Sequence, residues 1–137
     1  MSQILGYALG PIDPELHRDL TEKFPARYLS DWAVREAGVT TDALVANGLH
    51  TDHQPWTVLL VTPYLQGHVS LSQALILLRE KWPALRIAVL VGEDHEAIRP
   101  FIAKLAAYQI YNVLVADHFQ YNDLVDLITQ DWPWERI

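Results

Sequence analysis

Hydrophobic residues along this chain fall into two alternating patterns: short continuous apolar runs, and stretches in which apolar positions recur every three or four residues. The short runs have the length of buried strands, and a glycine, a proline or polar residues follow each of them. The second run is the weakest, because Ser30 and Asp31 interrupt it. Five strands are therefore expected, at residues 4–9, 27–32, 56–62, 86–91 and 111–115.

The stretches between these runs have the period of helices with one buried stripe. Asp13 and Pro14 mark the start of the first, since a carboxylate caps free N–H groups and proline fits the first helical position, and Pro25 is expected to end it. Pro100 places the start or a bend of the fourth helix nearby. Caps for the other helices are expected at Thr41, at Ser70 or Ser72, and at Asn122.

Strands that alternate with helices in this way predict a parallel sheet with helices on both faces. For five strands the commonest order is 2-1-3-4-5, the flavodoxin-like arrangement. We therefore expect an α/β three-layer sandwich formed by one domain over residues 1–130. Residues 131–137 are expected to lie beyond the fold as a tail, or as the start of a linker to a further domain.

Composition excludes several classes of function. The net charge of -7 leaves no basic surface for a nucleic acid, and the longest apolar runs fall short of a membrane helix. The chain contains no cysteine, which excludes thiolate chemistry and suits a reducing compartment, so we expect a cytoplasmic protein. His50 and His53 fall in a polar stretch that is typical of a solvated loop. We expect no metal and no cofactor.

Two stretches resemble the response-regulator receiver family. Residues 59–67 are similar to the receivers' third strand and the loop after it, in which the phosphorylated aspartate precedes a Pro-Gly turn; that position falls on Thr62. Residues 88–92 resemble the fourth strand, and the receiver hydroxyl position falls on Val91. Asp117 stands in the turn where the receivers carry a lysine, and Asp13 is the candidate left for their acidic pair.

The resemblance implies a receiver without phosphorylation chemistry. Receivers need the aspartate to accept the phosphoryl group, the acidic pair to hold magnesium, and the lysine and hydroxyl to stabilise the product. The chain resembles, through residues 60–65 and 110–114, the atypical receiver at the N-terminus of TadZ/CpaE-like pilus-assembly ATPases of the MinD/ParA superfamily. This similarity implies a domain that is not an enzyme and that serves dimerisation, localisation or partner docking.

Two alternatives stay open: a true receiver whose acceptor is displaced to Asp13 or Asp117, and a small-molecule sensor or enzyme that uses the same crevice. For the protein-binding reading we expect a homodimer through the fourth and fifth helices, as in receivers. Tyr108 and Tyr121 are the candidate contacts. Trp132 and Trp134 follow the last helix and either dock on their own domain or contact a partner.

Overall fold

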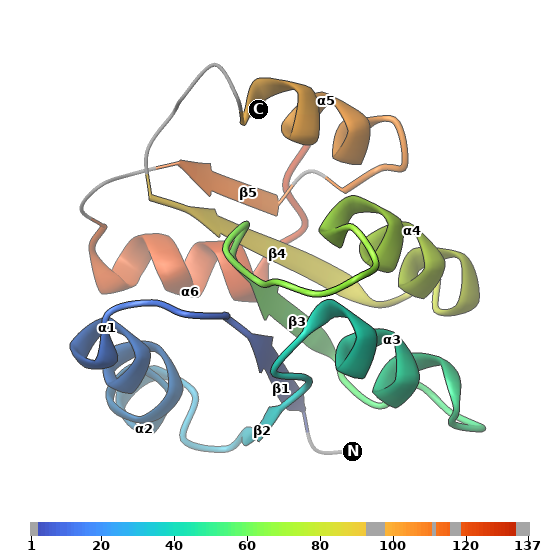
Figure 1. Cartoon of the computed structure of the whole chain (residues 1–137). Helices are drawn as coiled ribbons and strands as arrows, with labels where there is room; N and C mark the ends of the chain where they lie inside the picture. Colours follow the sequence, from blue (N-terminus) through green and yellow to red (C-terminus); the bar gives the residue numbers. More distant parts are fainter. Residues whose placement is uncertain (1–2, 93–97, 111, 116–118, 134–137) are drawn as a thin grey trace.

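The computed structural model describes residues 3–92, 98–110, 112–115 and 119–133. Within these ranges five parallel strands form one sheet in the order β2-β1-β3-β4-β5, which confirms the predicted flavodoxin-like arrangement (Figure 1). The strands are β1 (Ile4–Ala8), β2 (Ala33–Glu36), β3 (Val58–Val61), β4 (Arg86–Val91) and β5 (Asn112–Val115). The helices are α1 (Pro14–Arg18), η1 (Asp19–Lys23), α2 (Phe24–Tyr28), α3 (Thr41–Leu49), α4 (Leu71–Lys81), α5 (Arg99–Ala106) and α6 (Tyr121–Thr129).

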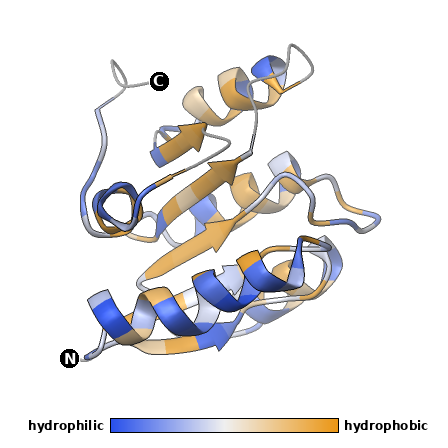
Figure 2. Cartoon of the chain, turned by 90° about the vertical axis from the view of Figure 1, so that its left-hand side faces the viewer, coloured by the Kyte–Doolittle hydropathy of each residue, from blue (hydrophilic) through white to orange (hydrophobic). Residues whose placement is uncertain are grey.

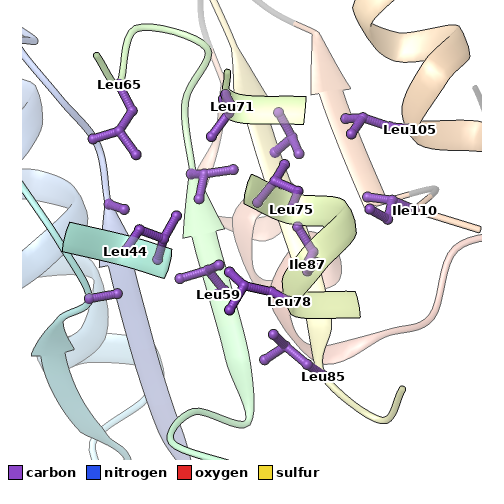
Figure 3. Packing of buried hydrophobic residues seen from close by; sticks show 14 of the residues in the cluster. Leu44, Leu59, Leu65, Leu71, Leu75, Leu78, Leu85, Ile87, Leu105 and Ile110 are labelled. Carbon is purple, nitrogen blue, oxygen red and sulfur yellow. The ribbon is translucent and has the colours of Figure 1, made fainter. Parts of the chain in front are cut away.

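Helices cover both faces of the sheet, with α1, α2 and α6 on one side and α3, α4 and α5 on the other (Figure 1). Successive strand residues point to opposite faces, so the unbroken apolar run of β3 has all four side chains buried, two against each helical layer. Figure 2 shows the central strands coloured as hydrophobic, while the helices in front of them alternate in colour. Figure 3 shows one of the two cores, to which Leu44, Leu59, Leu75, Leu78, Ile87 and Leu105 contribute.

The second strand differs from its prediction. Residues 27–32 are not a strand, since Arg27 and Tyr28 belong to α2, and β2 follows at Ala33–Glu36. The strand lies at the edge of the sheet, where half of its residues are exposed, so no apolar run marks it in the sequence. None of the four residues of β2 is fully buried, so a search for buried apolar runs does not find this strand.

Pro25 does not end the first helical segment. The chain widens into the π-helical segment η1, in which the Phe24 N–H bonds the Asp19 carbonyl five residues back. Pro25 then lies in the first turn of α2, where its missing N–H is not needed. The same rule holds at Pro100, which lies in the first turn of α5, as predicted.

The helix starts follow the expected chemistry, with two shifts. Asp13 caps α1 and Ser70 caps α4 as predicted, but Thr40 rather than Thr41 caps α3. Gln120, not Asn122, precedes α6 in a capping box with Asp123. Thr41 is instead a buried residue whose hydroxyl donates to the Val69 carbonyl at 2.6 Å.

Candidate functional site

The predicted site lies at the carboxyl edge of the sheet, where the loops after β1 and β3 meet. Thr62 directly follows β3, and 2% of its surface is exposed. Its hydroxyl donates a hydrogen bond to the Leu9 carbonyl at 2.6 Å and accepts one from the Tyr64 N–H at 3.2 Å. The hydroxyl thus links the ends of two neighbouring strands and has no proton left to donate to a ligand.

The loop after β1 lies directly against the loop after β3. Gly10 has φ +70°, and a Cβ on it would lie 2.8 Å from the backbone N and Cα of Leu65. A side chain at this position would therefore meet backbone atoms that cannot swing aside. The space between the two loops, where strand-end ligands bind in such sheets, is closed by backbone contact.

Among the described residues, the end of β4 brings the apolar Val91 and then Gly92 to this edge of the sheet. Val91, at the predicted hydroxyl position, is 1% exposed and belongs to the core beneath α4 and α5. Tyr64 reaches across from the loop after β3, since its hydroxyl lies 3.1 Å from where a Cβ on Gly92 would stand. Thr62 and Val91 are therefore both buried, at the positions that the resemblance assigned to phosphorylation.

Asp13 and Asp117 are the two candidate acceptors of a receiver with a displaced phosphorylation site. Asp13 is exposed at the start of α1, where its carboxylate accepts a hydrogen bond from the Glu15 N–H at 3.3 Å. Asp117 lies outside the described residues. In the described part of the chain, His, Asp and Glu side chains nowhere gather in a group of three or more that would hold a metal ion.

The loop after β3 is fastened to the N-terminus of α3. The Thr41 N–H donates to the Gln66 carbonyl at 2.9 Å, and the His68 N–H donates to the Asp42 carboxylate at 2.9 Å. The hydrogen bond from the His68 N–H is the largest cause that holds the pKa of Asp42 below its ordinary value. A Cβ on Gly67 would lie 2.1 Å from the Thr41 hydroxyl, so this turn has no room for a side chain. The segment that carries Thr62 is therefore held at both ends.

The two predicted contact tyrosines lie far apart. Tyr108 is 42% exposed and follows α5 at the amino-terminal end of β5, whereas Tyr121 begins α6 beyond the carboxyl-terminal end of the same strand. Tyr121 is half-buried: its ring packs at 5.5 Å from those of Phe24 and Tyr28, and its hydroxyl donates to Asp19 at 3.4 Å. Since α5 and α6 cover opposite faces of the sheet, the two residues do not form one patch.

Trp132 takes the first of its two predicted places, on its own domain. It is 6% exposed, its backbone N–H donates to the Asn112 side chain at 3.1 Å, and its indole N–H donates to the Asp126 carbonyl at 3.2 Å. Asp131 beside it pairs with Arg86 at 2.9 Å. Trp132 is thus not an exposed contact residue, and Trp134 lies outside the described residues.

An open hollow, which the sequence pattern did not indicate, lies at the carboxyl ends of β1 and β2. Two cavities of about 520 and 420 Å³ adjoin there and share Tyr7, Gly10, Pro11 and His17. We call the pair the β1–β2 crevice. The one sequence signal for it is Tyr7, a residue with a polar tip inside an otherwise apolar strand run. No helix among the described residues is both long and apolar enough to cross a membrane.

Solved structures of receiver domains share this fold. RcsB from Salmonella enterica serovar Typhimurium, bound to promoter rprA in the presence of phosphomimetic BeF3-, matches 89% of this chain with a TM-score of 0.64 and 17% identity. This chain spans 65% of that RcsB chain. The isolated REC domain of RcsB in the presence of BeF3- gives a TM-score of 0.62 at 15% identity, over 93% of this chain and 83% of that one.

The BeF3-activated DrrB receiver domain gives a TM-score of 0.60 at 12% identity, over 91% of this chain and 92% of that one. No protein-family model matches the chain, and no curated protein matches it. At these identities the likeness shows the fold, and the chemistry has to be argued from the residues of this chain.

Proposed function

We propose that this chain is a pseudo-receiver, a regulatory domain that accepts no phosphoryl group and acts by binding protein. The observation that carries the proposal is the state of Thr62, which is buried and engaged in two hydrogen bonds with the ends of β1 and β3. A phosphoryl acceptor has to be open to the incoming phosphate, and the place where it would enter is closed by the contact between Gly10 and Leu65.

The surrounding groups support the same conclusion. Transfer of a phosphoryl group needs cations or donors around the developing negative charge. Among the described residues, the group that contacts the Thr62 hydroxyl from β1 is the Leu9 carbonyl, which is an acceptor, and Val91 at the end of β4 is apolar. Asp13 is engaged as a helix cap, and a cap has a structural use of its own. The resemblance to TadZ/CpaE-like receivers agrees with a docking or localisation role.

Beryllofluoride binding tests the loss of phosphorylation chemistry. The protein is titrated with magnesium and beryllofluoride and observed by calorimetry and by amide NMR, with the isolated REC domain of RcsB as the positive control. We expect no heat and no shifts with this chain. Saturable binding with shifts around Asp13 would favour the displaced-acceptor receiver, and incubation with acetyl phosphate followed by intact-mass measurement would identify the modified residue.

For the assembly itself we propose a homodimer through α5, β5 and α6. The buried area expected for a stable pair is about 1,200 Å² or more in total. Tyr108 is exposed beside β5, which is the open edge of the sheet, so we retain it as a contact. We expect Tyr121 to stabilise the domain by packing against Phe24 and Tyr28, and not to contact the second copy.

Sedimentation velocity tests whether the protein forms this dimer in solution. We expect the wild type to be dimeric at high micromolar concentration and Tyr108→Glu to be monomeric, with an unchanged circular dichroism spectrum. Val39→Glu is the matched control, because Val39 is 65% exposed and follows β2 at the opposite edge of the sheet. A monomeric wild type would leave docking to a different protein as the remaining form of the proposal, whereas equal dissociation of both variants would show that the contact lies elsewhere.

A further inference from the structure

The β1–β2 crevice is separate from the closed contact at Thr62 and is open to solvent. Its two cavities, of about 520 and 420 Å³, each fall within the size range of ligand pockets. The larger cavity lies under α1, and the smaller one continues past Gly10 to Gly38 and Gln66 in the loops that follow β2 and β3. The hollow is thus longer than one small ligand requires.

Tyr7 forms the centre of the crevice. It lines both cavities, and the ring of His17 on α1 meets its ring edge-on, with centroids 5.7 Å apart and planes at 88°. In the described part of the chain the Tyr7 hydroxyl makes no hydrogen bond. An aromatic ring and a free hydroxyl therefore face the same open space.

Carboxylates approach this tyrosine from two sides. Tyr7 and Glu36 are register partners on β1 and β2, so their side chains leave the same face of the sheet. Glu22 lies across the crevice on η1. Burial is the largest cause that raises the pKa of Tyr7, and the negative charges of Glu36 and Glu22 raise it further. Arg18 also lines the larger cavity and brings a positive charge to it.

This combination selects for a cation. An aromatic face attracts a cation through its quadrupole, and flanking carboxylates attract it through charge. A guanidinium group satisfies both requirements, because it stacks flat on a ring and donates in-plane hydrogen bonds to carboxylates. A phosphate or a carboxylate ligand would be repelled by Glu22 and Glu36, both of which line the crevice.

We propose that the β1–β2 crevice binds the guanidinium group of an arginine side chain that a protein partner presents. The proposal rests on the protein-binding function and adds the place and chemistry of one contact. The crevice lies along the edge strand β2, where an approaching chain meets no covering strand, and its second cavity gives room for the residues next to the arginine.

Peptide titration tests the proposal directly. The ¹⁵N-labelled protein is titrated with an acetylated, amidated Gly-Arg-Gly peptide, and with the same peptide carrying neutral citrulline in place of arginine. We expect saturable amide shifts at Tyr7, Gly10, His17 and Gly38, with a dissociation constant of about a millimolar, as befits a single side chain. The citrulline peptide should cause none of these shifts. Equal shifts with both peptides, or no saturable shift with either, would overturn the assignment.

Variants with opposite charge effects make the test sharper. Glu36→Gln should weaken binding of the arginine peptide about threefold or more, and Arg18→Gln should strengthen it, because an exposed charge contributes a modest amount of either sign. Glu80→Gln is the matched control, since Glu80 is an exposed carboxylate on α4, on the other face of the sheet. A merely apolar groove would respond to none of the three.

A small free cation is the alternative ligand that the experiment has to distinguish from an arginine in a partner chain. If arginine amide, which has a free α-ammonium group, bound more tightly than the capped peptide, the crevice would favour a small free cation, and the assignment to a partner chain would be wrong. A negative peptide titration leaves the beryllofluoride and sedimentation results unchanged, so failure of this inference is distinct from failure of the pseudo-receiver proposal.

Discussion

Replacing Thr62 by valine should measure how strongly its hydroxyl joins β1 to β3. Valine keeps the shape of the side chain and removes both hydrogen bonds, one to the Leu9 carbonyl and one from the Tyr64 N–H. A buried carbonyl that loses its donor costs about 1–3 kcal/mol, and the longer bond from the partly exposed loop about 0.5 kcal/mol. The added methyl group offsets about 0.8 kcal/mol. The free energy of unfolding should therefore fall by about 1–3 kcal/mol.

Urea denaturation, followed by circular dichroism, provides the assay. A domain of this size has a urea slope of about 1.5 kcal/mol/M, so the midpoint should fall by about 0.7–2 M while the slope stays constant. Thr129→Val is the control: that hydroxyl also donates to a carbonyl, of Val125 at 2.5 Å, but this carbonyl lies within α6, where the helix provides another donor. If the two variants lay within 0.5 kcal/mol of each other, about the size of a surface effect, the Thr62 bridge would not stabilise the fold as argued.

Three further predictions concern the same framework. Gly10→Ala should lower the free energy of unfolding by about 1–3 kcal/mol, because the residue needs a positive φ and its Cβ would meet the Leu65 backbone; thermal melting measures it. Asn112→Ala should cost about 2–4 kcal/mol in urea, since its side chain makes three hydrogen bonds, at 2.6, 2.7 and 3.1 Å, to the end of α6 and the segment after it. The pKa of Asp42 lies below its ordinary value of 3.8, so the stabilisation from its bonds to His68 is present at neutral pH and is lost as the pH falls below about 4. The difference in urea midpoint between the wild type and Asp42→Asn should accordingly shrink between pH 6 and pH 3.

The sheet and its order are predictable from the sequence because a central strand, buried on both faces, consists of consecutive apolar residues. Every residue of β3 is apolar, since helices cover both faces of the sheet there, and no other element has that pattern. The edge strand β2 carries no such mark, because exposed Arg35 and Glu36 make up half of it. Prediction from apolar runs therefore placed the second strand too early, over the last two residues of α2 and the turn that follows them.

The site is predictable only in part, for a related reason. The sequence identifies Thr62 as the residue at the end of the central strand, but spacing does not show where its hydroxyl donates, and the partner Leu9 is 53 positions away. Apart from Tyr7, the sequence pattern gives no sign of the β1–β2 crevice. It depends on the register that places Glu36 beside Tyr7, and on the turn that brings α1 above them. Such contacts between distant residues are set by the fold and not by local pattern.

The closed crevice at β3 and the open one at β1–β2 have a common structural cause. Gly10 allows the loop after β1 to turn with φ +70° onto the backbone of Leu65, and this turn removes the space in which a strand-end ligand would bind. The same turn carries the chain through Pro11 to α1, and the hollow that remains lies on the other side of β1, against Tyr7. A ligand can therefore reach polar side chains beside Tyr7, where Glu36 is exposed and His17 is half-buried. It cannot reach Thr62, which is enclosed. For the pseudo-receiver that we propose, the recognition chemistry therefore belongs along the edge strand β2 and not at the centre of the sheet.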